Sequence, residues 1–245
     1  MKRTAAAWAA IGALGVVLAA TAVARASPLG AIFVAGAVGG YTLGGAWVLR
    51  HIRTGHPHAR FGAANTVTLM RMALAALSVG IMLDAVVVQG PVPDGLAWGA
   101  FAIAALGLAL DGIDGPLARC QNLESAFGAR FDMEVDAALI LALSVLAWAW
   151  GKCGAWVIVG GLLRYAFVAA GTVWPVLTGP LAPSFRRKVA AVVQGATLTA
   201  LAAPVITPPL SSVAAAAALA LLVYSFAVDV FRLLRSRRAS YSRPA

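Results

Sequence analysis

The amino-acid sequence predicts an all-α fold, a polytopic membrane bundle of about eight transmembrane helices. Of the 245 residues, 61% are hydrophobic and only 11% are charged, and the mean hydropathy is +0.87. An ordinary soluble domain has about 25% charged residues, so this composition excludes that class. The apolar parts of the chain are also rich in Ala and Gly, small residues that allow close packing between membrane helices.

Eight apolar stretches approach the length of about 20 residues that a helix needs to cross a bilayer. A turn at Pro91-Val-Pro93-Asp94-Gly95 separates the third stretch from the fourth. In chain order the stretches cover residues 5–23, 29–49, 66–88, 96–112, 134–150, 154–176, 188–206 and 210–232. They divide the chain into two N-terminal helices (1–50), a linker (51–65), a six-helix membrane domain (66–232) and a basic tail (233–245).

The first stretch has two interpretations. Lys2-Arg3, an apolar run and Ala24-Arg25-Ala26 are typical of a signal peptide with a small-residue cleavage site. The same residues can form an uncleaved anchor helix, which is the interpretation we favour. The other seven stretches keep their order in either case.

The distribution of positive charge predicts the orientation. If the linker 51–65 lies in the cytoplasm, only Arg25 and Lys152 fall outside, among the positive residues of the loops and ends. Both termini, the linker and the tail are then cytoplasmic, in a cell inner or plasma membrane. The net charge of +10 therefore reflects topology and attraction to membrane lipids. No soluble basic fold is available, so we expect no nucleic-acid partner.

Acidic residues are concentrated in one stretch that we also expect on the cytoplasmic side. The chain has nine, and six lie between residues 111 and 136: Asp111, Asp114, Glu124, Asp132, Glu134 and Asp136. Carboxylates are costly in a membrane-like sequence, so this cluster indicates a function. Asp111 and Asp114 are three residues apart and Asp132 and Asp136 are four apart, so each pair shares a helix face.

Four converging carboxylates repel one another unless cations lie between them. Oxygen ligands suit hard divalent ions, and Mg²⁺ or Mn²⁺ is the expected cofactor. Gly112 and Gly115 permit a ligand to approach the backbone, and Arg119 offers a planar fork for phosphate. Together these groups are suited to binding a phosphate or a pyrophosphate.

The spacing resembles the signature of the CDP-alcohol phosphatidyltransferases. Every fixed position is filled in the run Asp111-x2-Asp114-Gly115-x2-Ala118-Arg119-x8-Gly128-x3-Asp132-x3-Asp136. The resemblance covers about residues 61–232 and implies a membrane enzyme of phospholipid biosynthesis. Such an enzyme moves a substituted phosphate from a CDP-alcohol lipid donor, here CDP-diacylglycerol, to an alcohol acceptor and releases CMP. The resemblance also suggests a homodimer.

The same resemblance implies roles for individual residues. Asp111, Asp114 and Asp132 would hold one or two divalent ions, and Asp136 would act as the catalytic base. Spacing alone equally allows Asp136 to be a fourth metal ligand. The substrate pocket would be formed by Gly115, Ala118, Arg119, Ser125 and Gly128.

A second run of polar residues opens the third apolar stretch. Asn65, Thr68 and Arg71 recur at steps of three and share a helix face. One interpretation is a helix cap, a tolerated threonine and a snorkelling arginine. The family often carries Pro-Asn-x-x-Thr-x-x-Arg here, with Ala64 replacing the proline in this chain. By that resemblance, the three residues contact the nucleotide and its phosphates.

Two further cations are candidate substrate-binding residues. Arg164 lies inside the sixth stretch, where it can pair with an acidic site residue or reach a polar cavity. Lys188 belongs to a basic run that is either a positive-inside cluster or a pocket for acceptor or lipid phosphate. In phosphatidylglycerophosphate synthases a lysine and a threonine follow where Ala190 and Ala191 stand, which argues against glycerol 3-phosphate as the acceptor.

Several alternatives stay open at this stage. A small cation or proton transporter would also use membrane carboxylates, although the nearby arginines suit an anion better. The acceptor can be inositol phosphate, glycerol phosphate, serine, choline or another alcohol. His51, His56 and His58 are expected in a solvated linker, with a metal site as the alternative. Asp229 is expected to pair with Arg232 on the same helix.

Overall fold

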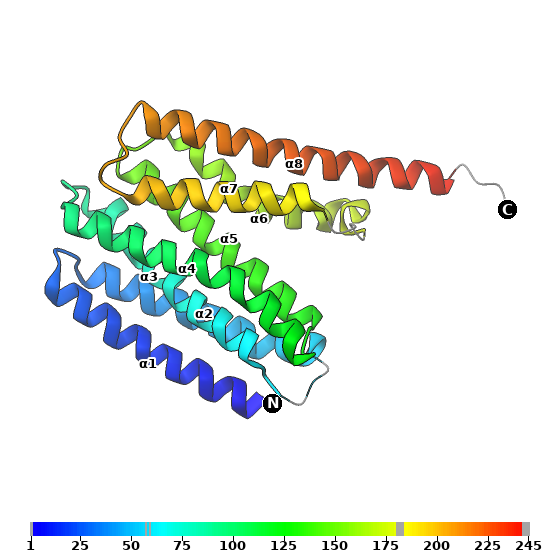
Figure 1. Cartoon of the computed structure of the whole chain (residues 1–245), viewed down its shortest axis with the longest axis horizontal. Helices are drawn as coiled ribbons and strands as arrows, with labels where there is room; N and C mark the ends of the chain where they lie inside the picture. Colours follow the sequence, from blue (N-terminus) through cyan, green and yellow to red (C-terminus); the bar gives the residue numbers. More distant parts are fainter. Residues whose placement is uncertain (1, 57, 59, 180–183, 242–245) are drawn as a thin grey trace.

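The structure is a computed structural model that describes residues 2–56, 58, 60–179 and 184–241. These residues form eight α-helices and two short 3₁₀ helices, without a strand, which confirms the all-α prediction (Figure 1). The helices are α1 (Lys2–Ala26), α2 (Ala31–Gly55), α3 (Ala63–Val88), α4 (Asp94–Gln121), α5 (Ala126–Ala149), α6 (Ile158–Val173), α7 (Phe185–Ala202) and α8 (Leu210–Tyr241). The 3₁₀ helices are η1 (Ala155–Val157) and η2 (Pro175–Thr178).

Six helical segments in the described part of the chain are long and apolar enough to cross a membrane. They are α1, α2, α3, α4, α8 and the segment Ala155–Val173, which joins η1 to α6. The remaining helices, α5 and α7, carry at least three charged residues in every 18-residue stretch. These two helices bring charged groups into an otherwise apolar bundle, as expected of a multi-pass membrane protein with a polar site.

The helices around the acidic stretch extend beyond the predicted apolar spans. α4 does not end at residue 112 but continues past Pro116 to Gln121. Asn122 then adopts a left-handed conformation (φ 52°), and its N–H donates to the Arg119 carbonyl at 3.1 Å, which ends the helix. α5 begins at Ala126, eight residues before the predicted 134, because Ser125 caps it by accepting from the Gly128 N–H at 3.0 Å. The apolar stretches predicted from hydropathy end near the charged residues, whereas α4 and α5 continue through them.

Two other predicted boundaries also change. The linker assigned to 51–65 shortens to 56–62, because α2 continues to Gly55 and α3 starts at Ala63. The basic tail begins as helix, since α8 runs on to Tyr241. Residues 242–245 lie outside the described part.

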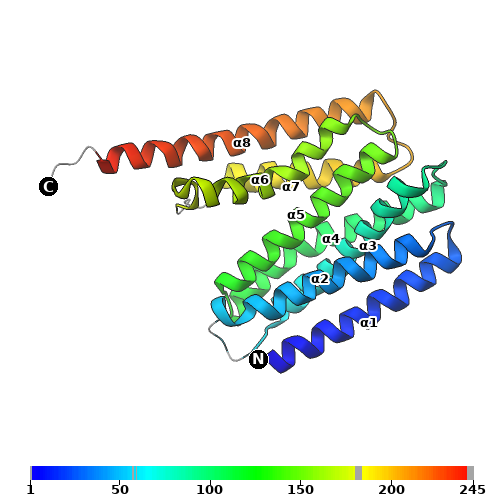
Figure 2. The same cartoon turned by 180° about the vertical axis from the view of Figure 1, so that it is seen from behind.

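α3 is the central helix of the half of the bundle that carries the N-terminus. It packs against α1, α2, α4 and α5, while α7 and α8 pair on the other side (Figures 1 and 2). α2 and α3 approach at backbone distance: a Cβ on Gly80 would lie 2.5 Å from the Phe33 carbonyl oxygen. A Cβ on Gly36 would lie 3.0 Å from the Gly80 Cα. Only glycine permits this contact, which fixes α2 against α3.

Candidate active site

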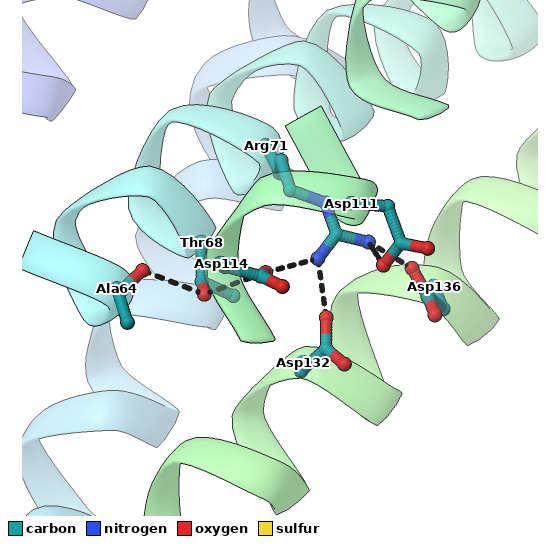
Figure 3. Close-up of polar contacts among 7 residues, drawn as sticks. All are labelled: Ala64, Thr68, Arg71, Asp111, Asp114, Asp132 and Asp136. Carbon is teal, nitrogen blue, oxygen red and sulfur yellow. Dashed lines mark hydrogen bonds and ion pairs between the residues drawn. The ribbon is translucent and has the colours of Figure 1, made fainter. Parts of the chain in front are cut away.

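Three helices bring the acidic residues of the motif together. α4 supplies Asp111 and Asp114, and α5 supplies Asp132 and Asp136 (Figure 3). α3 supplies Arg71, whose guanidinium lies among all four carboxylates. The convergence expected from the spacing is therefore present in the structure.

Arg71 is the centre of this cluster and only 3% of it is exposed. Its Nη1 donates to Asp114 Oδ2 at 2.6 Å and to Asp132 Oδ1. Its Nη2 lies 2.6 Å from Asp111 Oδ1 and donates to Asp136 Oδ1. One guanidinium faces four carboxylates, so the cluster keeps an excess of negative charge when all four are ionised. The sequence interpretation placed Arg71 at the nucleotide phosphates; its observed partners are the aspartates.

Three of the four aspartates form a set suited to a metal ion. Asp111, Asp114 and Asp132 each offer one carboxylate oxygen, and these oxygens all lie within 4.8 Å of one another. An all-oxygen, anionic donor set fits Mg²⁺ or Mn²⁺. Asp136 is not part of this set of three, although its Oδ1 and that of Asp111 both contact Arg71 Nη2.

Beside the cluster lies a cavity of about 220 Å³. Asp114 and Asp132 are among the residues that line it, so the carboxylates and the cavity form one site. The sequence-predicted substrate residues that line it come from three helices and one connection: Asn65, Thr68, Gly115, Ala118, Arg119, Ser125 and Gly128.

Packing around Gly128 explains why the start of α5 can lie against the start of α3. A Cβ at this position would lie 3.1 Å from Asn65 Oδ1 and 3.2 Å from Ser125 Oγ. The Asn65 amide donates to the Phe61 carbonyl at 2.5 Å. Thr68 Oγ1 is within hydrogen-bonding distance of Asp114 Oδ2, at 3.3 Å, which connects the polar face of α3 to the acidic cluster.

His56 is a site-adjacent residue that sequence reasoning missed. The expectation of a solvated linker is wrong for it, because the side chain is 5% exposed and stacks on Phe127. Its Nε2 lies 3.4 Å from Asn65 Nδ2. Burial lowers the pKa of His56, which favours the neutral ring that can accept from that amide. No sequence pattern signalled this contact, because it depends on how α2 ends beside α3.

The two remaining predicted substrate residues lie outside the cavity lining. Arg164 of α6 pairs with Glu134, which lies two residues from both Asp132 and Asp136 on another face of α5. Lys188, near the start of α7, is exposed and interacts electrostatically with Asp111. Neither residue has a hydrogen bond or ion pair to the four aspartates within the described part of the chain.

The expected pair of Asp229 with Arg232 is wrong. Asp229 of α8 is buried and pairs with Arg186 at 2.5 Å and with Arg187 at 3.4 Å. Both arginines belong to α7, so tertiary packing of α7 on α8 decides the partner. The i,i+3 spacing of Asp229 and Arg232 on α8 does not decide the partner.

Comparison with known proteins supplies one match. A search of curated proteins and a search of solved structures each returned nothing similar to the chain. A family model described as CDP-alcohol phosphatidyltransferase matches residues 61–228, a region that contains α3 to α7 and most of α8. The match spans more than half of the chain and includes every residue of the cluster and its cavity. The chain therefore belongs to the CDP-alcohol phosphatidyltransferase family.

Proposed function

We propose that the protein transfers a phosphatidyl group from CDP-diacylglycerol to the hydroxyl of an alcohol acceptor and releases CMP. Family membership makes it a transferase of lipid synthesis with a CDP-alcohol donor and an alcohol acceptor. The observation that carries the finer proposal is the shared site, in which the acidic cluster opens into a cavity lined by seven predicted substrate residues. The CDP-lipid donor requires both parts: the acidic cluster for its diphosphate and the cavity for its nucleotide.

In this reaction the acceptor oxygen attacks the phosphorus that carries the diacylglycerol. The phosphoanhydride bond breaks, and the bridging oxygen leaves on CMP. Asp136 takes the proton of the attacking hydroxyl, the role that the resemblance of the motif implies for the fourth aspartate. Mg²⁺ or Mn²⁺ held by Asp111, Asp114 and Asp132 would neutralise the diphosphate and stabilise the leaving CMP.

The cavity residues position the donor. Arg119 offers its fork to phosphate, while Asn65 and Ser125 offer polar groups to the nucleotide. Ala118 and Gly115 leave room for the nucleotide against α4. We assign these residues to affinity for the donor, because they line the cavity.

We further propose that the site faces the cytoplasm and that the enzyme is a homodimer. The positive-inside bias of the sequence supports a cytoplasmic position for the α4–α5 connection, where the cavity lies. The N-terminal end of α1 lies at the same end of the bundle (Figures 1 and 2). A soluble acceptor and a lipid donor can both reach a site at that boundary. The dimer is proposed from family resemblance alone.

The test uses purified protein in detergent with labelled CDP-diacylglycerol and Mg²⁺ or Mn²⁺. Alcohols are offered one at a time, and CMP release is measured. Release with one alcohol, absent in Asp132→Ala, would establish the reaction and identify the acceptor. If no alcohol supports release and CDP gives no thermal stabilisation, the proposed reaction is wrong and an ion transporter becomes the better hypothesis.

Arg164 gives a separate prediction, because its partner in the structure is Glu134. If Arg164 binds substrate phosphate, Arg164→Ala raises the KM for donor or acceptor about tenfold, as expected for a lost charge-assisted hydrogen bond. Glu134→Gln removes the partner and keeps the cation, so we expect it to leave KM within about threefold of wild type, below 1 kcal/mol. Equal effects of the two variants would show that the ion pair only braces α5 against α6.

A further inference from the structure

A groove runs along α1 and α3 on the outside of the candidate site. It has a volume of about 290 Å³, and its lining is almost entirely apolar. Trp8, Gly12 and Gly15 of α1 face Leu69, Met70 and Ala73 of α3 across it. Gly15 leaves space open on this side of α1, because a Cβ there would meet no heavy atom within 4 Å.

Next to the groove lies a larger cavity of about 810 Å³. Trp8 and Thr66 line both spaces, so the two are neighbours. The larger cavity adds the polar side chains of Thr4 and Gln121 and the exposed cation Arg60. This larger cavity, the chamber, has a mixed lining that includes one cation, and it lies next to an apolar groove. A cation beside an apolar groove has the chemical order of the phosphate and acyl chain of a phospholipid.

The length of the groove also fits a lipid chain. Its lining on α3 extends from Thr66 to Leu77, which is about 16 Å at 1.5 Å per residue. One leaflet of a bilayer has a hydrocarbon depth of about 15 Å. The groove is therefore about as long as the hydrocarbon depth of one leaflet, which is the depth that an acyl chain spans. Trp8 at its upper end is the residue type that anchors at this boundary.

The face of α3 excludes the reacting donor as the occupant. Thr66, Met70, Ala73 and Leu77 recur every three or four residues and form the groove face. Thr68 and Arg71 point to a different side of the helix, toward the aspartates. A chain in the groove is thus separated from the acidic cluster by α3 itself. Its head-group cavity shares only Leu123 with the wall of the 220 Å³ cavity.

We propose that the groove and its chamber bind one anionic diacylphospholipid of the bilayer, with an acyl chain against α1 and α3 and its phosphate at Arg60. The lipid fastens α1 to the first turns of α3, the segment that carries Asn65 and Thr68 into the site. The binding residues on α1 lie outside the family-matched region 61–228. The proposal is independent of the reaction that the site performs.

Gly15 offers a clean way to fill the groove. Gly15 lines the groove and a Cβ there meets no heavy atom within 4 Å, so Gly15→Phe adds a side chain at the groove without a clash at its Cβ. Gly12 is unsuitable, because its Cβ would lie 1.9 Å from Tyr41 Oη. Gly39 on α2 is the matched control: it is also open within 4 Å, is exposed and lines neither space.

The experiment is native mass spectrometry of the full chain from micelles doped with palmitoyl-oleoyl phosphatidylglycerol or phosphatidylcholine. We expect one retained phosphatidylglycerol per chain and about a fivefold preference over phosphatidylcholine, as one surface cation gives. Gly15→Phe should lower retention about tenfold or more, since excluding two methylenes suffices for that. Arg60→Gln should lose the preference, and Gly39→Phe should match wild type.

Two outcomes would overturn the proposal. Unchanged lipid retention in Gly15→Phe, with a melting temperature equal to wild type, would show that the groove is not the lipid site. Loss of a dimer mass in Gly15→Phe with unchanged lipid retention would show that the groove seats a second copy of the chain. The small residues of the lining would then serve helix packing. The same spectra report the intact mass and hence whether α1 is retained.

Discussion

Asp136→Asn is expected to lower the rate of CMP release by about 10²–10⁴-fold, the usual contribution of a general base. The amide keeps the shape of the side chain and can still contact Arg71, but it cannot take a proton from the acceptor. Metal-dependent binding of the CDP-lipid should stay within about threefold of wild type, a change below 1 kcal/mol. Rates are measured by CMP release and binding by titration with Mn²⁺ and CDP.

The control for this variant is Asp94→Asn, the same chemical change in the exposed first turn of α4. It should leave both quantities unchanged. Asp132→Asn is the second comparison, because we expect this variant to weaken metal binding as well as turnover. If Asp136→Asn turns over at near the wild-type rate, Asp136 is not the base. If it loses metal binding as Asp132→Asn does, it is a fourth ligand.

Arg71→Ala is expected to destabilise the metal-free protein by about 3–5 kcal/mol, the usual cost of removing one partner of a buried ion pair. Four carboxylates then face one another without a cation. In a chain of this size the loss corresponds to a fall in melting temperature of about 6–20 °C. The measurement is thermal unfolding in detergent with EDTA.

Divalent ions distinguish this explanation from simple loss of packing. Mg²⁺ or Mn²⁺ should raise the melting temperature of Arg71→Ala more than that of wild type, because the guanidinium no longer competes for the carboxylates. Arg71→Lys keeps one positive charge and should fall between the two proteins. Equal metal-induced shifts in wild type and Arg71→Ala would contradict the view that Arg71 and the ion share the same ligands.

The parts of the site that could be predicted from sequence are those set by local helical geometry. Asp111 with Asp114, and Asp132 with Asp136, are fixed on one face by their spacing, whatever the rest of the chain does. Gly128 could be identified from the family motif. The structure adds the reason, because the absence of a side chain at Gly128 leaves room for Asn65.

The parts that sequence reasoning missed depend on tertiary packing. Arg71 could be placed on the polar face of α3, but not at the centre of the aspartates, because that requires the rotation of α3 against α4 and α5. His56 does lie in the linker, but its burial beside Asn65 depends on how α2 ends against α3. The choice of Arg186 over Arg232 by Asp229 has the same origin in the packing of α7 on α8.

The glycine contact between α2 and α3 has a consequence for where the folding unit begins. The family-matched residues start at 61, after α2 has ended. Yet Phe33 and Tyr41 of α2 are almost fully buried in the same apolar core as Ile81 of α3. A fragment that starts at residue 61 would expose the face of α3 that packs against α2, including the backbone at Gly80. The packed unit of this protein therefore begins before the family-matched region, because α2 supplies part of the core that surrounds α3.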